Sequence, residues 1–165
     1  MAALQWSEAL ALDTPAMDRI HEEFILLLAE VEDVPDDGLL GCWRTLIAHT
    51  AEHFGREDDW MRSTGFASAN CHSVQHRVVL QVMREGLAAG ERGDLLAVRG
   101  MAHELGVWFV QHAQTMDAAL ALHLRSVGLD LETGQLARPE ALPATALHHC
   151  GSAGCRSGAA EAAGA

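Results

Sequence analysis

Seven side chains that can bind a metal ion recur at helical spacing along this 165-residue chain. His53 and Glu57 are four residues apart, as are His72 and His76, so each pair shares one face of a helix. A third pair joins an imidazole to a carboxylate five residues further on, and one histidine stands alone nearer the N-terminus. The complete set is His21, His53, Glu57, His72, His76, His112 and Asp117. Because imidazole is the commonest metal ligand in proteins, this pattern predicts metal binding.

The set is too large for one metal ion. Two ions bridged by both carboxylates would use all five imidazoles and both acids, whereas a single ion would not. Burying Glu57 and Asp117 without cations would also cost several kcal/mol. Imidazole-rich, thiol-free coordination suits iron, copper or zinc, and bridging carboxylates inside a helix bundle favour a di-iron centre.

Four amphipathic segments must position these side chains. Apolar residues recur at helical spacing over about residues 16–33, 39–63, 70–88 and 95–127, with turn residues between the segments. Each segment carries at least one of the candidate ligands, and patterns typical of strands are sparse. We predict an all-α fold, an antiparallel up-down four-helix bundle. In a continuous fourth helix, Asp117 is turned around the axis from His112 and reaches a point beside it.

The two ends of the chain differ from the bundle. Residues 1–15 predict an extended N-terminal arm, and the bundle domain is assigned to residues 1–130. Residues 131–165 form an Ala/Gly-rich C-terminal tail, in which 13 of the 27 residues from Pro139 onward are Ala or Gly, and we expect it to be mobile. The tail contains four groups that bind metals or respond to redox state, but their spacing is poor for zinc and favours a disordered end: His148, His149, Cys150 and Cys155.

Composition excludes several classes of function. A formal net charge of −12 argues against nucleic acid and anionic membranes as partners. No apolar run approaches the roughly 20 residues that a membrane span needs, and the N-terminus lacks the basic region of a signal peptide. The absence of lysine and tyrosine excludes Schiff-base and tyrosyl chemistry. The four cysteines are too scattered for a disulfide scaffold, so we expect reduced thiols and a cytoplasmic location.

The order of the motifs resembles the hemerythrin family. The similar segments are residues 17–21 (MDRIH), 53–57 (HFGRE), 72–76 (HSVQH) and 112–117 (HAQTMD), together with Trp6 and residues 108–111 (WFVQ). The resemblance covers about residues 4–127 and includes all seven ligand positions in order. One His-x3-Glu or His-x3-His motif alone would be a weak signal, but one motif on each predicted helix is a strong one. The length is similar to that of single-domain bacterial members.

The resemblance implies a ligand arrangement. Three imidazoles would hold one iron and two the other, with both carboxylates and an oxo or hydroxo group as bridges: His72, His76 and His112 on the first, His21 and His53 on the second, Glu57 and Asp117 between them. The second iron is then one ligand short, and dioxygen is expected at that position. The residues that could wall an apolar oxygen pocket, or equally form ordinary core, are Phe24, Phe54, Trp108, Phe109 and Ala113.

We therefore predict reversible dioxygen binding at a non-haem di-iron centre, for storage, delivery or sensing, without enzymatic activity. Di-iron oxidases place four carboxylates around their metals, and anionic ligands stabilise high-valent iron, so two carboxylates favour a carrier. The alternative is a di-iron redox enzyme on the same fold, an oxidase or an enzyme that detoxifies peroxide or nitric oxide. Delivery or signalling would involve a protein partner, with the tail as a docking segment. We expect a monomer or a weak oligomer.

Several residues near the motifs have weaker expectations. His49 lies one turn before His53 and is expected to be a partly buried histidine rather than a support for the site. His103 and His123 are expected at the surface. Cys71 should face away from the site, although it precedes His72. Asp58, directly after Glu57, is expected on the outer face without a role.

Overall fold

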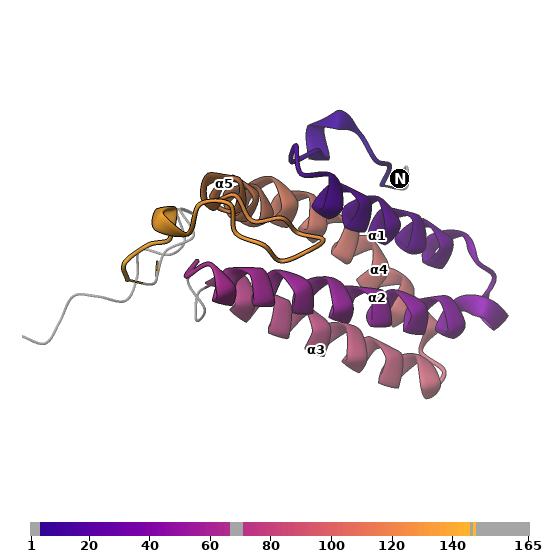
Figure 1. Ribbon diagram of the computed structural model, residues 1–165. Helices are drawn as coiled ribbons and strands as arrows, with labels where there is room; N and C mark the ends of the chain where they lie inside the picture. Colours follow the sequence, from indigo (N-terminus) through magenta and orange to yellow (C-terminus); the bar gives the residue numbers. More distant parts are fainter. Residues whose placement is uncertain (1–3, 67–70, 146, 148–165) are drawn as a thin grey trace, which may run out of the picture.

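A computed structural model describes residues 4–66, 71–145 and 147. Most of these residues belong to four long helical rods (Figure 1). The first three are α1 (Pro15–Asp33), α2 (Asp36–Ser63) and α3 (Cys71–Glu91), and the fourth joins α4 (Leu95–His112), the π-helical turn η2 (Ala113–Asp117) and α5 (Ala118–Val127). Short 3-10 turns lie at Glu8–Leu10 (η1) and Pro139–Ala141 (η3). Isolated β-bridges occur, but no strand is present among the described residues. The prediction of an all-α four-helix bundle is confirmed.

Local signals explain where the helices begin and end. α2 begins at Asp36, three residues earlier than predicted, directly after Pro35. Asp36 and Asp37 lie in its first turn, where negative charge is favourable because the backbone N–H groups there carry partial positive charge. At the start of α4, the Asp94 carboxylate accepts a hydrogen bond from the backbone N–H of Ala97 at 3.0 Å. α5 ends at Val127, and the residue that follows, Gly128, has a φ of 67°, which suits glycine.

The rods pack in a ring, with α1 against α2, α2 against α3, α3 against α4, and α4 against α1. Short connections between successive helices make neighbours antiparallel, so the topology is up-down. Figure 1 shows the four rods lying side by side along one direction. Apolar residues on the inner faces form one buried cluster toward the end of the bundle that holds the α1–α2 connection. Its members include Phe24, Leu28, Trp43, Leu46 and Phe109.

A second apolar cluster lies at the opposite end of the bundle. It includes Met17, Met61, Phe66, Leu120 and Leu124. On α1, α2 and the fourth rod, the candidate ligands fall in the sequence between residues of the first cluster and residues of the second. The fold therefore places a polar layer between two apolar layers, where a buried charge has little access to water.

The fourth rod differs from its prediction at one place. We expected a continuous α-helix over residues 95–127, but residues 113–117 form a π-helical turn. In a regular α-helix, residues five apart point roughly 140° from one another, at 100° per residue. A π turn is wider by one residue, so it brings His112 and Asp117 onto the same face. The single extra residue is what directs both side chains inward.

The N-terminal arm is folded against the bundle. The Asp18 carboxylate accepts hydrogen bonds from the backbone N–H groups of Leu12 and Thr14 at 2.8 and 3.1 Å, which fixes the entry to α1. The fourth rod also contacts the arm: the Gln114 side chain donates to the carbonyl of Ala9 at 3.3 Å, and Arg125 donates to the carbonyl of Leu12. Contacts to α1 and to the fourth rod thus hold residues 9–14 in place.

Part of the predicted C-terminal tail lies within the described residues. After Gly128 the chain reverses direction, and the backbone N–H of Ala137 donates to the carbonyl of Gly128 at 2.9 Å. Arg19 on α1 pairs with Glu132 at 2.8 Å, and the N–H of Leu147 donates to the carbonyl of Gly65 at 2.8 Å. Residues 131–142 therefore form a loop over the end of the bundle, whereas residues 148–165, with the four predicted redox or metal groups, lie outside the described residues.

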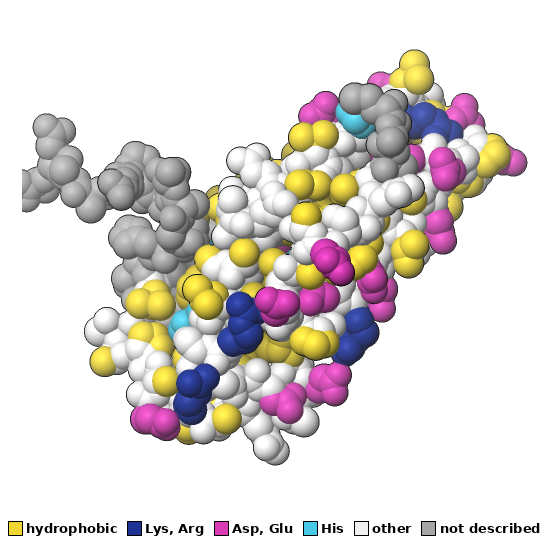
Figure 2. Space-filling model, turned by 90° about the horizontal axis from the view of Figure 1, so that it is seen from above, with side chains coloured by type: hydrophobic (Ala, Val, Ile, Leu, Met, Phe, Trp, Pro, Cys, Tyr) yellow, Lys and Arg dark blue, Asp and Glu magenta, His cyan; other side chains and the backbone are white. Residues whose placement is uncertain are grey.

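The surface is mixed in character. On the face seen in Figure 2, acidic side chains lie among a few arginines and scattered apolar side chains. None of the helices in the described part of the chain is long and apolar enough to span a membrane.

Candidate metal centre

The seven side chains singled out in the sequence meet in one buried cluster. All of them are buried, with at most 2% of each residue exposed. Their ligand atoms form two overlapping groups, and within each group the atoms lie within 4.8 Å of one another. The first group contains His72, His76 and His112, the second contains His21 and His53, and both contain Glu57 and Asp117. The two carboxylates are therefore shared between two sets of imidazoles.

Each carboxylate divides its oxygens between the two groups. Oε1 of Glu57 lies 3.1 Å from Nε2 of His53, while Oε2 lies 3.2 Å from Nε2 of His76. Oδ2 of Asp117 lies 3.3 Å from Nε2 of His21, while Oδ1 lies 3.0 Å from Nε2 of His72. A carboxylate that presents one oxygen to each of two ligand sets has the arrangement required to bridge two ions.

Many polar atoms of the cluster have no hydrogen-bond partner. These include both ring nitrogens of His21 and of His72, Oε2 of Glu57 and both oxygens of Asp117. Buried polar groups are normally paired, because an unpaired one loses its hydration without compensation. Nε2 of His72 and Oδ1 of Asp117 approach each other closely yet form no hydrogen bond, as expected when both atoms are directed at a third. The donor set therefore fits metal ions.

Electrostatics in the metal-free chain point the same way. Burial by itself lowers the pKa of His21 and His72, but the neighbouring carboxylates of Asp117 and Glu57 outweigh it, raising the pKa to about 9 for His21 and about 10 for His72. Burial favours a raised pKa for Glu57, yet the charge of His53 and the surrounding imidazoles hold it well below its usual range. Protons on imidazoles thus balance buried carboxylates where cations would otherwise do so.

Asp117 and His112 complete this balance. Burial and the neighbouring Glu57 both favour a raised pKa for Asp117, but His112 and His21 hold it well below its usual value. The pKa of His112 is lowered, with burial as the main cause. Both carboxylates are therefore ionised at neutral pH in the metal-free chain, despite being completely buried.

Aromatic rings surround the cluster at the positions expected from the sequence. Phe54 stacks on the ring of His76 with centroids 4.0 Å apart and 6° between planes, and Trp108 stacks on His112 at 4.4 Å. The edge of Phe109 meets His21 at 5.2 Å, and Phe24 stacks on Phe109 at 4.4 Å. Ala113 is also fully buried in the adjoining apolar cluster. These five residues thus lie against the ligand rings or in the adjoining apolar cluster.

We predicted that Asp58 lies on the outer face without a role, and that prediction is wrong, because Asp58 contacts a clustered histidine. Its Oδ1 lies 3.0 Å from Nδ1 of His76, and its side chain is only 30% exposed. Burial lowers the pKa of His76, whereas the hydrogen bond to Asp58 and the neighbouring Glu57 carboxylate raise it above its usual value. One residue after Glu57 on a helix is about 100° further around, which directs Asp58 to α3 rather than to solvent. The i+1 position gave no sign of this contact without knowledge of the helix neighbours.

Gln75 is a second contact that the sequence did not indicate. Its Oε1 lies 3.2 Å from Nδ1 of His112, and the indole N–H of Trp108 donates to the same oxygen at 3.3 Å. Gln75 occurs within the HSVQH motif, directly before His76, but its contact is with the fourth rod. Only its place inside a motif, between two ligand positions on α3, could have drawn attention to it.

The other histidines and the cysteines among the described residues are not members of the cluster. His49 is partly buried, as expected, and pairs with Glu23 at 3.2 Å. His123 is half-buried and bonds to the carbonyl of Thr64 at 3.1 Å, so the surface position expected for it is only partly correct. Cys42 is a free thiol, whereas Cys71 is disulfide-bonded, so the prediction of reduced thiols is wrong at Cys71.

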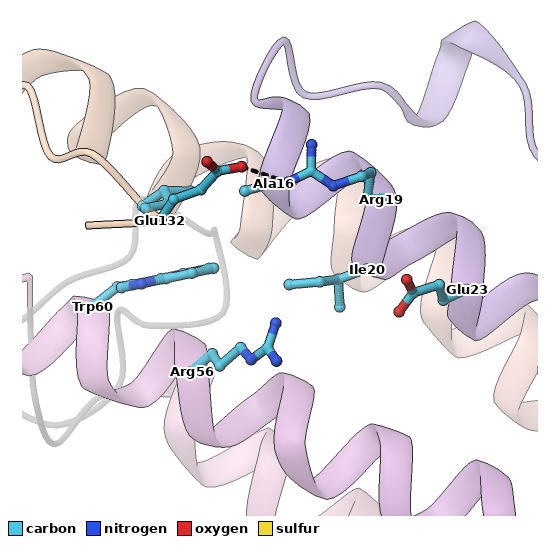
Figure 3. A pocket seen from close by; sticks show the side chains of 8 residues that line it. Ala16, Arg19, Ile20, Glu23, Arg56, Trp60 and Glu132 are labelled. Carbon is cyan, nitrogen blue, oxygen red and sulfur yellow. Dashed lines mark hydrogen bonds and ion pairs between the residues drawn. The ribbon is translucent and has the colours of Figure 1, made fainter. Parts of the chain in front are cut away.

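Two pockets open between α1 and α2 near the cluster. The larger, of about 430 Å³, is shown in Figure 3, with Arg56 and Trp60 reaching in from α2 and the Arg19–Glu132 pair at its rim. Arginine and glutamate line it together, so its charges largely balance. A smaller pocket of about 40 Å³ has the buried His53 among its lining residues. Of the two, only the smaller one reaches a candidate ligand.

Comparisons with known proteins agree with this geometry. A family model described as "Hemerythrin HHE cation binding domain" matches residues 12–122, a span that contains all seven clustered side chains. A curated bacteriohemerythrin of Ralstonia nicotianae (strain ATCC BAA-1114 / GMI1000) is 36% identical over 130 residues, which cover 79% of this chain and 95% of that protein. No solved structure matches the chain.

Proposed function

This chain belongs to the hemerythrin family, and on that premise we propose that its buried cluster holds two iron ions and binds dioxygen reversibly. The observation that carries the proposal is the division of each carboxylate between two sets of imidazoles. That division gives every one of the seven side chains a role. Two iron cations would also neutralise the buried carboxylates, whose burial would otherwise be costly.

In this proposal the ligands follow the two groups of the cluster. His72, His76 and His112 would hold one iron, His21 and His53 would hold the other, and Glu57 and Asp117 would be shared between them. When bound, the iron pair would supply reversible redox chemistry toward dioxygen. The group with two imidazoles has one protein ligand fewer, so dioxygen would be expected on that side.

The surrounding side chains support binding rather than turnover. Phe109 and Phe24 place apolar surface beside His21, which keeps water from that side of the cluster. Only two carboxylates contribute anionic charge, which disfavours the high-valent iron that an oxidase needs. The part of the chain that the structure describes contains no tyrosine to supply a proton and an electron. A carrier for storage, delivery or sensing therefore fits the site better than a di-iron redox enzyme.

The test is metal analysis combined with optical spectroscopy. We expect two irons per chain, oxo-bridge charge-transfer bands in air, and a spectrum that reverses when oxygen is removed and restored over minutes. Zinc, a single iron or no metal would contradict the proposed site. Rapid irreversible oxidation with turnover of an added reductant would replace the carrier with the redox enzyme.

We propose a cytoplasmic location and a monomer or weak oligomer. A cytoplasmic location is tested at Cys71, because a stable disulfide is unusual in a reducing compartment. Alkylation of the protein inside cells, followed by mass spectrometry, should find Cys71 modified if the compartment is reducing. An unmodified Cys71 would contradict the cytoplasmic assignment. Sedimentation of the purified chain tests the predicted monomer or weak oligomer.

A further inference from the structure

The outward-facing ring nitrogens divide the five imidazoles into two classes. Nδ1 of His76 and Nδ1 of His112 each have a side-chain partner, whereas Nδ1 of His21, His53 and His72 are buried with none. Both partnered rings belong to the same ligand group. The three-imidazole group is therefore anchored from outside, and the two-imidazole group is not.

The two partners differ in charge. Asp58 offers a carboxylate to Nδ1 of His76 at 3.0 Å, whereas Gln75 offers a neutral amide oxygen to Nδ1 of His112 at 3.2 Å. A carboxylate partner makes an imidazole a stronger electron donor at its other nitrogen than a neutral acceptor does. Two ligands of the same ion thus receive unequal support from their surroundings.

A chain of donors fixes the tautomer of His112. The indole nitrogen of Trp108 can only donate, so the Gln75 atom that it contacts must be the amide oxygen. That oxygen then accepts from Nδ1–H of His112, which leaves Nε2 of the ring with a free lone pair directed into the cluster. The stacking of Trp108 on His112 holds the same ring from its face.

His76 is held in an equivalent way. Asp58 accepts from its Nδ1–H, and Phe54 covers the face of the ring at 4.0 Å with nearly parallel planes. Nε2 then faces the cluster, 3.2 Å from Oε2 of Glu57 and 3.3 Å from Nε2 of His112. A ring that is fixed both by a hydrogen bond and by a stacked neighbour loses little entropy when it binds a metal.

We propose that Asp58 and Gln75 are positioning residues that pre-organise the His72, His76 and His112 group, so that this group takes up the first metal ion and the His21 and His53 group the second. The inference rests on the proposed two-metal site. It adds an order of loading and a difference in donor strength between two ligands that the family assignment does not specify.

The first experiment is an anaerobic titration of the metal-free protein with Fe²⁺ against a competing chelator. Wild type should show a tighter and a weaker phase. Asp58→Leu removes the acceptor and should weaken the tighter phase about 10- to 100-fold while leaving the weaker one unchanged. Asp59→Asn is the matched control, because Asp59 is exposed and pairs with Arg62 at the surface. Equal weakening of both phases, or of neither, would overturn the inference.

The second experiment separates electronic support from mere structural support. Asp58→Asn retains an acceptor but removes the charge, so the reduction potential of the iron pair should rise. Gln75→Glu adds a charge behind His112, so the potential should fall. A purely structural role would not produce shifts of opposite sign. Shifts in the same direction, or none, would contradict the proposed difference in donor strength.

A third measurement needs no metal and separates failure of the inference from failure of the proposed function. In the metal-free protein, NMR should find Nδ1–H protons with the downfield shift of a side-chain hydrogen bond, protected from exchange by that bond, on His76 and His112 alone among the five rings. Asp58→Leu should remove protection at His76, and Gln75→Leu at His112. If wild type binds fewer than two irons, the proposed function fails, and these spectra still decide whether the two rings are anchored as inferred. The same downfield shift at Nδ1–H of all five rings would overturn the inference.

Discussion

The two ligand groups of the cluster have different surroundings. On one side, His76 and His112 have hydrogen-bond partners behind them and aromatic faces stacked on them. On the other side, His21 and His53 have no partner at Nδ1, and His21 meets the edge of Phe109 instead. Polar contacts hold the rings of the first side. On the second side an apolar wall lies beside His21, and the small pocket between α1 and α2 reaches His53.

This difference matches the requirements of the two positions. An ion that keeps all its ligands benefits from rings held in one tautomer and one orientation. A position that must accept and release a small apolar molecule benefits from an apolar wall and from the absence of competing hydrogen-bond donors. In the proposed di-iron site, this arrangement would separate holding a metal from leaving a coordination position open.

The largest expected effect comes from removing a residue that both sides share. Glu57→Gln replaces one carboxylate oxygen by an NH2 group and removes the charge, so residue 57 can no longer serve both sides, and iron content should fall from two per chain to one or none, with loss of the oxo-bridge bands. Iron analysis and the optical spectrum measure it. Glu52→Gln, an exposed position on the same helix, is the control and should retain two irons. Two irons in Glu57→Gln would show that the sides do not depend on a common bridge.

A pH series tests whether each side of the metal-free cluster carries a proton. The pKa of His21 and His72 is raised to about 9 and about 10, so their contribution to folding is complete below about pH 6.5 and is lost as pH rises through those values. Because one pKa unit corresponds to about 1.4 kcal/mol, the free energy of unfolding should fall by on the order of 3 kcal/mol for one such group.

Urea unfolding of the metal-free protein between pH 6 and 10 measures this loss. Metal binding must displace the same protons, so the affinity for Fe²⁺ should rise over the pH range in which metal-free stability falls. A metal-free stability that is constant from pH 6.5 to 10 would mean that the imidazoles are neutral, and that the charge balance described above is incorrect.

A smaller effect is expected from loosening only the apolar side. Phe109→Leu keeps the side chain apolar but removes the ring edge from His21, so it should cost about 1 kcal/mol of stability. Water then reaches the second side more easily, and the oxygenated form should oxidise several times faster, as followed by the decay of its spectrum. Val107→Ala on the same helix is 60% exposed and should change neither quantity. An unchanged decay rate in Phe109→Leu would show that this ring does not limit access of water.

The smallest effect is expected away from both sides. Arg19→Ala breaks the pair with Glu132 that ties the loop after α5 to α1, and both of these side chains are more than half exposed. Such surface pairs contribute about 0–1 kcal/mol, so the melting temperature should change by no more than a few degrees and the iron content should stay at two. Loss of iron in this variant would mean that the loop supports the cluster directly.

Much of the fold and of the candidate site could be predicted because the relevant signals are local. The spacing of His53 and Glu57, and of His72 and His76, reports helical geometry directly, since residues four apart lie on one face. The four apolar periods report the helices in the same way. Those predictions needed no knowledge of how the helices are arranged in space.

The failures occurred where that arrangement matters. The π turn at Ala113–Asp117 brings Asp117 onto the face of His112, and nothing in the local apolar pattern distinguishes it from a regular helix. Asp58 was assigned to solvent because helical position alone does not say which neighbouring helix a side chain meets.

The sequence by itself determined which groups could bind metal and which helix carries each of them, because residue type and helical period are properties of short segments. Only the tertiary structure decided that Glu57 and Asp117 each turn one oxygen to each set of imidazoles, and that Asp58 and Gln75 stand behind two of the rings. The reason is physical: contacts between helices depend on their relative rotation and spacing, which are set by packing along the whole length of the bundle.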